Sequence, residues 1–257
     1  MFIYSFVIIL LALIFYKAYP YLNPAPTCFD HKMNGDEAGV DCGGGCELSC
    51  HNEVIPVEVK FARAVKTEDN LYDLIAMVQN KNTDKDVSDG IINYKFSVYD
   101  KSGSLIFIVS GSSSLPVGQT FPVIIQNVPL DLSSSGNDIS KVVCEVSFNS
   151  QDWVKVDPIY GNNFFKIEST DFQNDKNNIS QLTVSLTDTT KASFKNVPVR
   201  VTLEDGNGNF IAVNETILPE IKSAETRDIS FTWRSPLGIE NPKITVYPIV
   251  TPITEFK

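Results

Sequence analysis

FSVYDKSGSLI at residues 96–106 and VTLEDGNGNFI at residues 201–211 decide the fold, because they share one pattern. Each starts with alternating apolar and polar residues, passes through an Asp-x-x-Gly segment and ends in a second apolar stretch. Alternation with a period of two indicates a strand with one buried face, and Asp-x-x-Gly indicates a hairpin turn. The two segments therefore predict two copies of one β-hairpin.

Two further pairs of segments extend this repeat in the same order along the chain. Residues 72–82 match residues 181–190, and residues 115–125 match residues 221–231. Three matches in one order favour a tandem duplication over two unrelated sheets. The sequence therefore predicts two related β domains, over residues 51–157 and 158–257.

Other windows show the same alternation, and none shows a sustained helical period. The residues expected on buried strand faces are Tyr94, Phe96 and Val98; Val142, Cys144, Val146 and Phe148; Val199, Val201 and Leu203; and Ile229, Phe231 and Trp233. Short strands at regular spacing, separated by turn signals, are typical of sandwiches. We expect an all-β fold of two tandem antiparallel immunoglobulin-like β-sandwiches.

Four residues of the repeated hairpins are expected to make turns. Asp100 and Asp205 correspond, as do Gly103 and Gly208. An aspartate side chain accepts hydrogen bonds from backbone amides two residues on, and glycine adopts positive φ without a steric penalty. We interpret all four as turn residues rather than ligands.

The repeats resemble the FxLyD-type, immunoglobulin/fibronectin-like domain of prokaryotic envelope proteins. The matching segments are Val78–Asn80, Tyr99–Gly103 and Gly118–Thr120 in the first copy, with departures at Leu186–Asp188, Glu204–Gly208 and Ala224–Thr226 in the second. The resemblance covers about two thirds of the chain and implies a binding or spacer module without catalytic residues.

CFDHKMNGDEAGVDCGGGCELSC, at residues 28–50, holds four of the five cysteines. The spacing of Cys28, Cys42, Cys46 and Cys50 lacks the Cys-x2-Cys pairs of a zinc ribbon or redox centre. Two disulfides are expected, because so short a segment cannot bury enough surface to fold alone. The pairing stays open among three connectivities, and the nearby histidines keep a zinc site as an alternative.

The same segment, called the cysteine module below, resembles a short cysteine-rich motif of bacterial surface proteins. That resemblance implies surface display and no particular activity. Five residues offer the hard oxygen ligands that calcium prefers: Asp30, Asn34, Asp36, Glu37 and Asp41. Their spacing does not fit an EF-hand, so turn formation is the competing interpretation.

The N-terminal stretch MFIYSFVIILLALIFYKAY, residues 1–19, predicts a membrane-spanning signal anchor. About 18 residues at ~1.5 Å each would cross ~27 Å, close to the thickness of one hydrocarbon core. A proline-rich linker follows at residues 20–27. Clustered cysteines indicate an oxidising compartment, so residues 20–257 are expected outside the cell.

Composition and motifs limit the function. A formal charge of −10 argues against nucleic acid as a partner. No hydrolase elbow, zincin motif or phosphate loop is present, so we expect no enzyme and no small-molecule substrate. No cofactor is expected apart from the Ca²⁺ alternative.

Together these features predict a membrane-anchored, surface-displayed binding or scaffold protein. It would present two β-sandwiches to an extracellular or envelope protein partner. One alternative is a structural subunit of an envelope assembly, such as a pilus or secretion system. The other is an envelope enzyme with an unrecognised carboxylate site.

Overall fold

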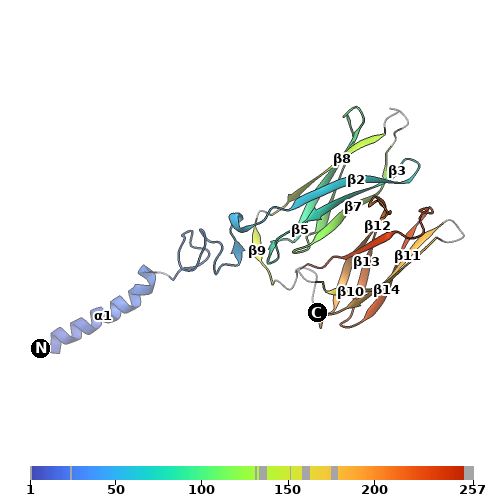
Figure 1. The fold of residues 1–257 in the computed structure, drawn as a ribbon. Helices are drawn as coiled ribbons and strands as arrows, with labels where there is room; N and C mark the ends of the chain where they lie inside the picture. Colours follow the sequence, from blue (N-terminus) through green and yellow to red (C-terminus); the bar gives the residue numbers. More distant parts are fainter. Residues whose placement is uncertain are drawn as a thin grey trace. The chain divides into compact units, whose positions relative to one another are not determined.

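The computed structural model describes residues 2–23, 25–130, 132, 138–150, 152–157, 163–174 and 179–251. Contacts between residues divide the chain into two compact units, residues 1–53 and residues 54–257. The first unit contains helix α1 (Phe2–Leu22), the short strand β1 (Leu48–Ser49) and the 3-10 helix η1 (His51–Glu53). The cysteine module also belongs to it. Figure 1 shows α1 at the N-terminal end of the chain.

The predicted membrane anchor is wrong. Among the described residues, no helix has both the length and the apolar character needed to cross a bilayer. The apolar sequence of α1 is interrupted by the charge of Lys17, and Pro20 lies inside the helix. The predicted location, a single-pass membrane protein with residues 20–257 outside the cell, is therefore corrected as well.

The second unit confirms the expected all-β fold (Figure 1). Its strands are β2 (Glu58–Glu68), β3 (Leu71–Gln79), β4 (Lys85–Val87), β5 (Ile91–Asp100), β6 (Leu105–Ser114), β7 (Thr120–Pro129), β8 (Ile139–Phe148), β9 (Trp153–Lys155), β10 (Phe165–Asn174), β11 (Ser180–Asp188), β12 (Phe194–Glu204), β13 (Phe210–Ile221), β14 (Thr226–Trp233) and β15 (Lys243–Pro248). We call residues 54–157 the first half and residues 163–251 the second half.

In the part of the chain that the structure describes, each half contains two antiparallel three-stranded sheets with the same connections. The sheets are β2-β3-β7 and β6-β5-β8 in the first half, and β10-β11-β14 and β13-β12-β15 in the second. β4 and β9 form a further antiparallel pair. Strand β3 of the first half therefore corresponds to β11, β5 to β12, and β6 to β13.

The pairing register repeats as well as the strand order. Tyr94 lies opposite Gly111, and Val199 lies opposite Thr216, so both partners shift by the same 105 positions (199 − 94 and 216 − 111). The register irregularity at Val98/Tyr99 recurs at Leu203/Glu204, again 105 positions on. Because register is set by turn geometry and the hydrophobic pattern, this identity is a stronger sign of duplication than the short sequence matches.

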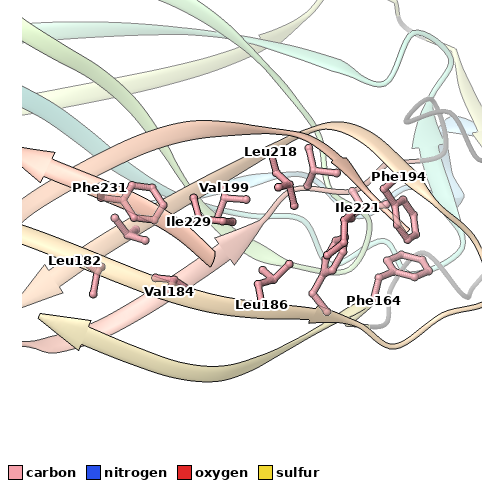
Figure 2. Close-up of a cluster of buried hydrophobic side chains, with 14 of the residues drawn as sticks. Phe164, Leu182, Val184, Leu186, Phe194, Val199, Leu218, Ile221, Ile229 and Phe231 are labelled. Atoms are coloured by element: carbon pink, nitrogen blue, oxygen red, sulfur yellow. The ribbon is translucent and has the colours of Figure 1, made fainter. Parts of the chain in front are cut away.

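One buried apolar cluster lies in each half, and both draw on the strand faces that alternation predicts. In the first half Tyr94, Phe96 and Val98 of β5 contribute to the cluster. In the second half Val199 of β12 packs among Leu182, Val184, Ile229 and Phe231, as Figure 2 shows.

The two halves are nevertheless not separate. Ile249, which follows β15, is only 1% exposed and belongs to the cluster of the first half. The C-terminal end of the second half therefore completes the core of the first.

Candidate binding site

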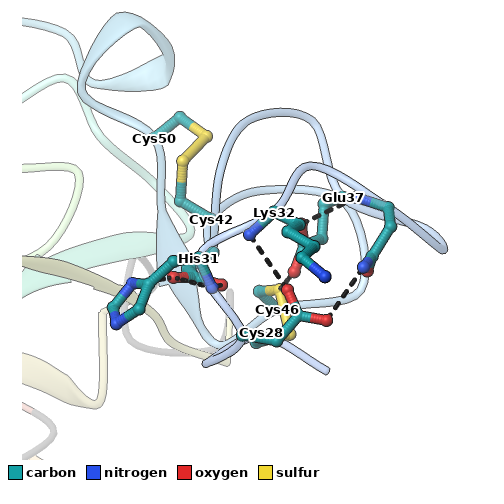
Figure 3. The surroundings of a disulfide bond; sticks show 10 residues. Cys28, His31, Lys32, Glu37, Cys42, Cys46 and Cys50 are labelled. Carbon is teal, nitrogen blue, oxygen red and sulfur yellow. Dashed lines mark hydrogen bonds and ion pairs between the residues drawn. A yellow bond between two sulfur atoms is a disulfide. The ribbon is translucent and has the colours of Figure 1, made fainter. Parts of the chain in front are cut away.

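The cysteine module confirms the expected disulfides and fixes their pairing as Cys28–Cys46 and Cys42–Cys50 (Figure 3). All four sulfurs are therefore oxidised, and none remains as a thiolate for zinc. The module buries few side chains besides Cys46, Ser49 and Cys50. Covalent bonds thus take the place of an apolar core in this short segment.

The glycine run lets the chain fold back between the two disulfides. Gly44 has φ +51°, and a Cβ added there would lie 1.6 Å from the carbonyl oxygen of Asp36. The neighbouring Gly45 amide donates a 2.9 Å hydrogen bond to that same oxygen. Only glycine fits at position 44, because any side chain would displace the Asp36 backbone.

The side chains of four predicted calcium ligands make local hydrogen bonds, and these are Asp30, Asn34, Glu37 and Asp41. Asp36 accepts a hydrogen bond at its backbone carbonyl oxygen. Asp30 accepts from the Lys32 amide at 3.0 Å and from the Asn34 side chain at 2.8 Å. The Asn34 hydrogen bond is the main reason that the pKa of Asp30 lies below its usual value. Asp41 accepts from the His31 amide at 3.0 Å and lies 2.9 Å from His31 Nδ1.

Glu37 differs from these residues because it reaches a disulfide. Its Oε2 accepts from the Asn34 amide at 3.2 Å, and its Oε1 lies 3.6 Å from Cys46 Sγ. Within the described residues, the one cluster with metal-ligand geometry is Cys28, Glu37 and Cys46. Its two sulfurs are bonded to each other, so it is not a metal site. Within the described residues of the module, no three carboxylates lie close enough together to share a metal ion.

The repeated hairpin turns have matching geometry. Asp100 Oδ1 accepts from the Ser104 amide at 2.9 Å, and Asp205 Oδ1 accepts from the Asn209 amide at 2.8 Å. The glycines adopt positive φ, +82° at Gly103 and +79° at Gly208. Each glycine amide also donates to the carbonyl oxygen of its own aspartate. Both aspartates are therefore occupied in shaping the turn.

The two halves meet along an apolar contact that we call the seam. Its buried residues are Val65, Ile75, Met77 and Val213, and Phe61, Ile124, Phe210 and Tyr247 pack against them. Strand β13 lies against β2, β3 and β7 (Figure 1). The rings of Phe61 and Phe210 are 5.3 Å apart. The seam therefore joins the outer face of one sheet from each half.

Arg200 lies in the seam and is 5% exposed. Its Nη1 donates to the carbonyl oxygen of Pro122 at 2.7 Å, and its Nη2 donates to Ser113 Oγ at 2.9 Å. Its Nε forms an ion pair with Glu215. A buried charge is tolerated only when it is paired and hydrogen-bonded, and this guanidinium uses its donors to tie β12 to β6 and β7.

A cleft of about 210 Å³ opens beside the seam. Residues of both halves line it, and its charged and amide-bearing members include Lys66, Glu68, Asp73, Gln126, Asn214 and Arg234. Gln126 donates across the boundary to the carbonyl oxygen of Val213 at 3.5 Å. The cleft therefore offers both hydrogen-bond donors and hydrogen-bond acceptors at the boundary between the two halves.

Asp73 reaches this cleft because of a β-bulge. Residues 126 and 127 of β7 lie opposite the single residue Asp73 of β3, and Asn127 has φ +56°. The Asn127 amide donates to Asp73 Oδ1 at 2.9 Å. Burial raises the pKa of Asp73, and the hydrogen bond only partly opposes this. Bulges commonly re-aim a side chain next to a site.

Burial also raises the pKa of groups outside the cleft, among them Cys144 and Asp86. Burial raises the pKa of the Cys144 thiol to about 12, so this free cysteine is an inert part of the core. Burial also raises the pKa of Asp86 to about 7. Asp86 is 1% exposed, and its Oδ2 has no hydrogen-bond partner among the described residues.

Sequence reasoning missed the seam, although two signals for it were present. LIAMV at 74–78 is a continuous apolar run, as expected for a strand buried on both faces. Arg200 interrupts the apolar strand VPVRVTL, where a charge needs a partner. The segment between β14 and β15 also contributes to the cleft, through Ser235 and Leu237.

Comparison with known proteins identifies no relative by sequence. No family model and no curated protein matches the chain. Solved structures with some likeness include a red sea bream transglutaminase, with 9% identity over 75% of this chain and 29% of that chain and a TM-score of 0.25. A Parabacteroides merdae beta-glucuronidase has 13% identity over 76% and 28% of the two chains and a TM-score of 0.23.

A beta-glucuronidase from glycoside hydrolase family 2 has 12% identity over 83% of this chain and 25% of that chain, with a TM-score of 0.20. The chain thus spans less than a third of the length of these proteins. No argument about function rests on likenesses at this level.

Proposed function

We propose that this chain is a non-enzymatic binding or scaffold protein. It presents two immunoglobulin-like β-sandwiches of the FxLyD-like type, residues 51–157 and 158–257, to a protein partner. The observation that carries the proposal is the seam, where buried Arg200 ties strands of both halves. A seam with a buried apolar cluster holds the halves at one spacing and angle, which is what a scaffold requires.

The repeated register supports the duplicated-domain part of this proposal. Both halves keep the same pairing across β5/β6 and β12/β13, including the irregularity next to the turn. The outer faces of the corresponding strands β3 and β11 differ. Ile75 and Met77 of β3 are buried in the seam, whereas β11 carries Thr183 and Ser185 at the corresponding positions.

The cleft beside the seam is the proposed contact site for the partner. It combines Lys66 and Arg234 with the carboxylates of Glu68 and Asp73. Charges of both signs together with amide groups can form hydrogen bonds and ion pairs with a polar side chain or with the end of a partner's chain. The loop from Ser235 onward, at the edge of the cleft, would contribute to that contact.

Site-specific photo-cross-linking tests the proposal. A photoreactive residue at Ser235 is compared with one at Lys222, an exposed position in another turn of the second half. We expect one partner protein to cross-link from position 235, with no product from position 222. Equal products from the two positions, or none from position 235, would contradict a binding role for the cleft.

The enzyme alternative has one observation in its favour, the buried carboxylate in the cleft. Both histidines lie outside the second unit, at His31 and His51, so proton transfer there would fall to Asp73 and Glu68. A hydrolase screen on the full chain, with Asp73→Asn as its control, distinguishes the two functions. Turnover that Asp73→Asn abolishes would replace the scaffold proposal by the enzyme.

Calcium binding by the cysteine module stays a prediction, and one atom favours it. Asn34 Oδ1 is buried and has no hydrogen-bond partner among the described residues. A calcium ion would use such an oxygen together with the Asp30 and Glu37 carboxylates. The prediction is that millimolar calcium raises, and EDTA lowers, the melting temperature of the module. No change with either reagent would reject it.

A further inference from the structure

Strand β6 differs from the other edge strands of the four sheets that enclose the two cores. Every other edge strand carries a charged residue or a proline, from Lys60 and Arg63 in β2 to Lys243 and Pro248 in β15. β6 has the sequence LIFIVSGSSS and contains neither. Charges and prolines are the usual means of keeping an edge from pairing with another strand. β6 lacks that protection.

The repeat supplies an internal standard for this edge. β13 occupies the same place in the second half and carries Glu215, Pro219 and Glu220. The position equivalent to Ile108 is Val213, again 105 residues on, and Val213 is fully buried in the seam. Ile108 itself is 51% exposed. The same outward position is therefore apolar in both halves, but it is covered by protein in the second half and exposed in the first.

Leu105, at the start of β6, repeats this contrast. It is 49% exposed, whereas its equivalent Phe210 packs against the seam. Among the described strands, β6 pairs only with β5, so its outer edge is free. The free edge and the exposed apolar side chains thus occur on one strand.

We propose that β6 is a self-association edge, at which two copies of this chain pair antiparallel about a two-fold axis at Ile108. The two β6-β5-β8 sheets would then join into one six-stranded sheet. Ile108 would lie opposite Ile108 of the second copy, and Phe107 opposite Val109. Such directly opposed apolar pairs are the stabilising unit of an antiparallel sheet.

Charge explains why a second copy is the favoured occupant. A two-fold axis places each residue near its own copy, so any charge close to the axis meets the same charge. The chain carries a formal charge of −10, and most of its edges bear charged side chains. Of the two edge strands without charge, β7 contains Pro122 and Pro129. β6 is therefore the edge at which two identical chains meet with neither like charges nor prolines in the paired strands.

Sedimentation velocity of the full chain over a concentration series tests the proposal. We expect reversible dimers of the wild type, and monomers for Ile108→Lys at every concentration. Ile217→Lys is the matched control, because Ile217 is a 57% exposed isoleucine on the equivalent strand β13. A monomeric wild type would overturn the proposal, as would equal dissociation by both variants.

Oxidative cross-linking tests the register and separates this dimer from association through the exposed apolar side chains of α1. Ile108→Cys places two thiols at the two-fold axis and should give a disulfide-linked dimer. Ser112→Cys on the same strand would place its thiols roughly 26 Å apart, at about 3.3 Å per residue, and should give none. Equal cross-linking at the two positions, or none at position 108, would reject β6 pairing.

Discussion

The cysteine module and the second unit solve the problem of stability in different ways. The module holds its shape with two disulfides and a set of backbone hydrogen bonds to carboxylates. The second unit relies on three buried apolar clusters among its described residues. The difference shows that chain length decides the means, because a 23-residue segment cannot bury enough apolar surface to repay its conformational entropy.

The largest expected effect is the loss of the module on removal of a disulfide. Replacing Cys28 and Cys46 by serine removes a constraint worth about 2–4 kcal/mol, more than so small a segment has in reserve. We expect amide protection to vanish over residues 28–50 while the melting temperature of the second unit stays unchanged. Hydrogen exchange read by mass spectrometry measures both. A module that stays protected without the bond would show that something other than covalent linkage holds it.

The corresponding test of the second unit is to create a cavity in one of its apolar clusters. Phe96 and Phe231 are buried in the clusters of the first and second halves, with 0% and 2% exposure. Phe96→Ala or Phe231→Ala should each cost about 3–5 kcal/mol of unfolding free energy, because both the burial and the packing are lost. Denaturant titration should show this loss, and the module disulfides should stay intact. A cost below ~1 kcal/mol would mean that the clusters are loosely packed.

Asp86 gives the second unit a pH dependence that the module does not share. Its pKa is raised to about 7, so between pH ~4 and ~7 the folded state keeps a proton that the unfolded state has lost. The stabilisation is complete below pH ~4 and disappears as the pH rises through about 7, a change of roughly 2–4 kcal/mol.

Asp86→Asn should remove this slope, because the amide does not ionise. Thermal melts between pH 4 and pH 8 provide the measurement. Asp69→Asn is the control, since that carboxylate is 98% exposed and should leave the slope as it is. An unchanged slope in Asp86→Asn would place the titration elsewhere.

The smallest effect compares the two copies of the hairpin turn. Gly103→Ala and Gly208→Ala should each cost about 1 kcal/mol, because a Cβ is strained at positive φ while no neighbouring atom lies within 4 Å. Gly206→Ala is the control, since Gly206 has open space and no positive φ. Chemical denaturation of the three variants should separate the first two from the third. Unequal costs at positions 103 and 208 would show that the turns have diverged.

The sequence was sufficient to predict the core residues of strands that have one buried and one exposed face. Phe96 and Val201 could be placed in a core from alternation alone, and Asp100 and Asp205 could be placed in turns from their spacing to glycine. The seam could not be found in this way. Ile75, Met77 and Arg200 lie on the opposite faces of their strands, and alternation assigns such faces to solvent.

The prediction that the N-terminal helix spans a membrane was wrong for another reason. Apolar composition and approximate length suggested a span over residues 1–19, but among the described residues no helix has both the length and the apolar character needed to cross a bilayer. The disulfide pairing lay beyond the sequence as well, because four cysteines permit three connectivities and only the fold of the glycine run selects one.

Calorimetry of Arg200→Met tests most directly the claim that the seam makes one body of the two halves. The wild type should unfold residues 54–257 in a single transition. The variant leaves the Pro122 carbonyl and Ser113 hydroxyl without their donor, at about 1–3 kcal/mol each, and should split that transition in two. Arg227→Met, at an exposed position of β14, should leave one transition. Two transitions in the wild type, or one unaltered transition in Arg200→Met, would contradict the claim.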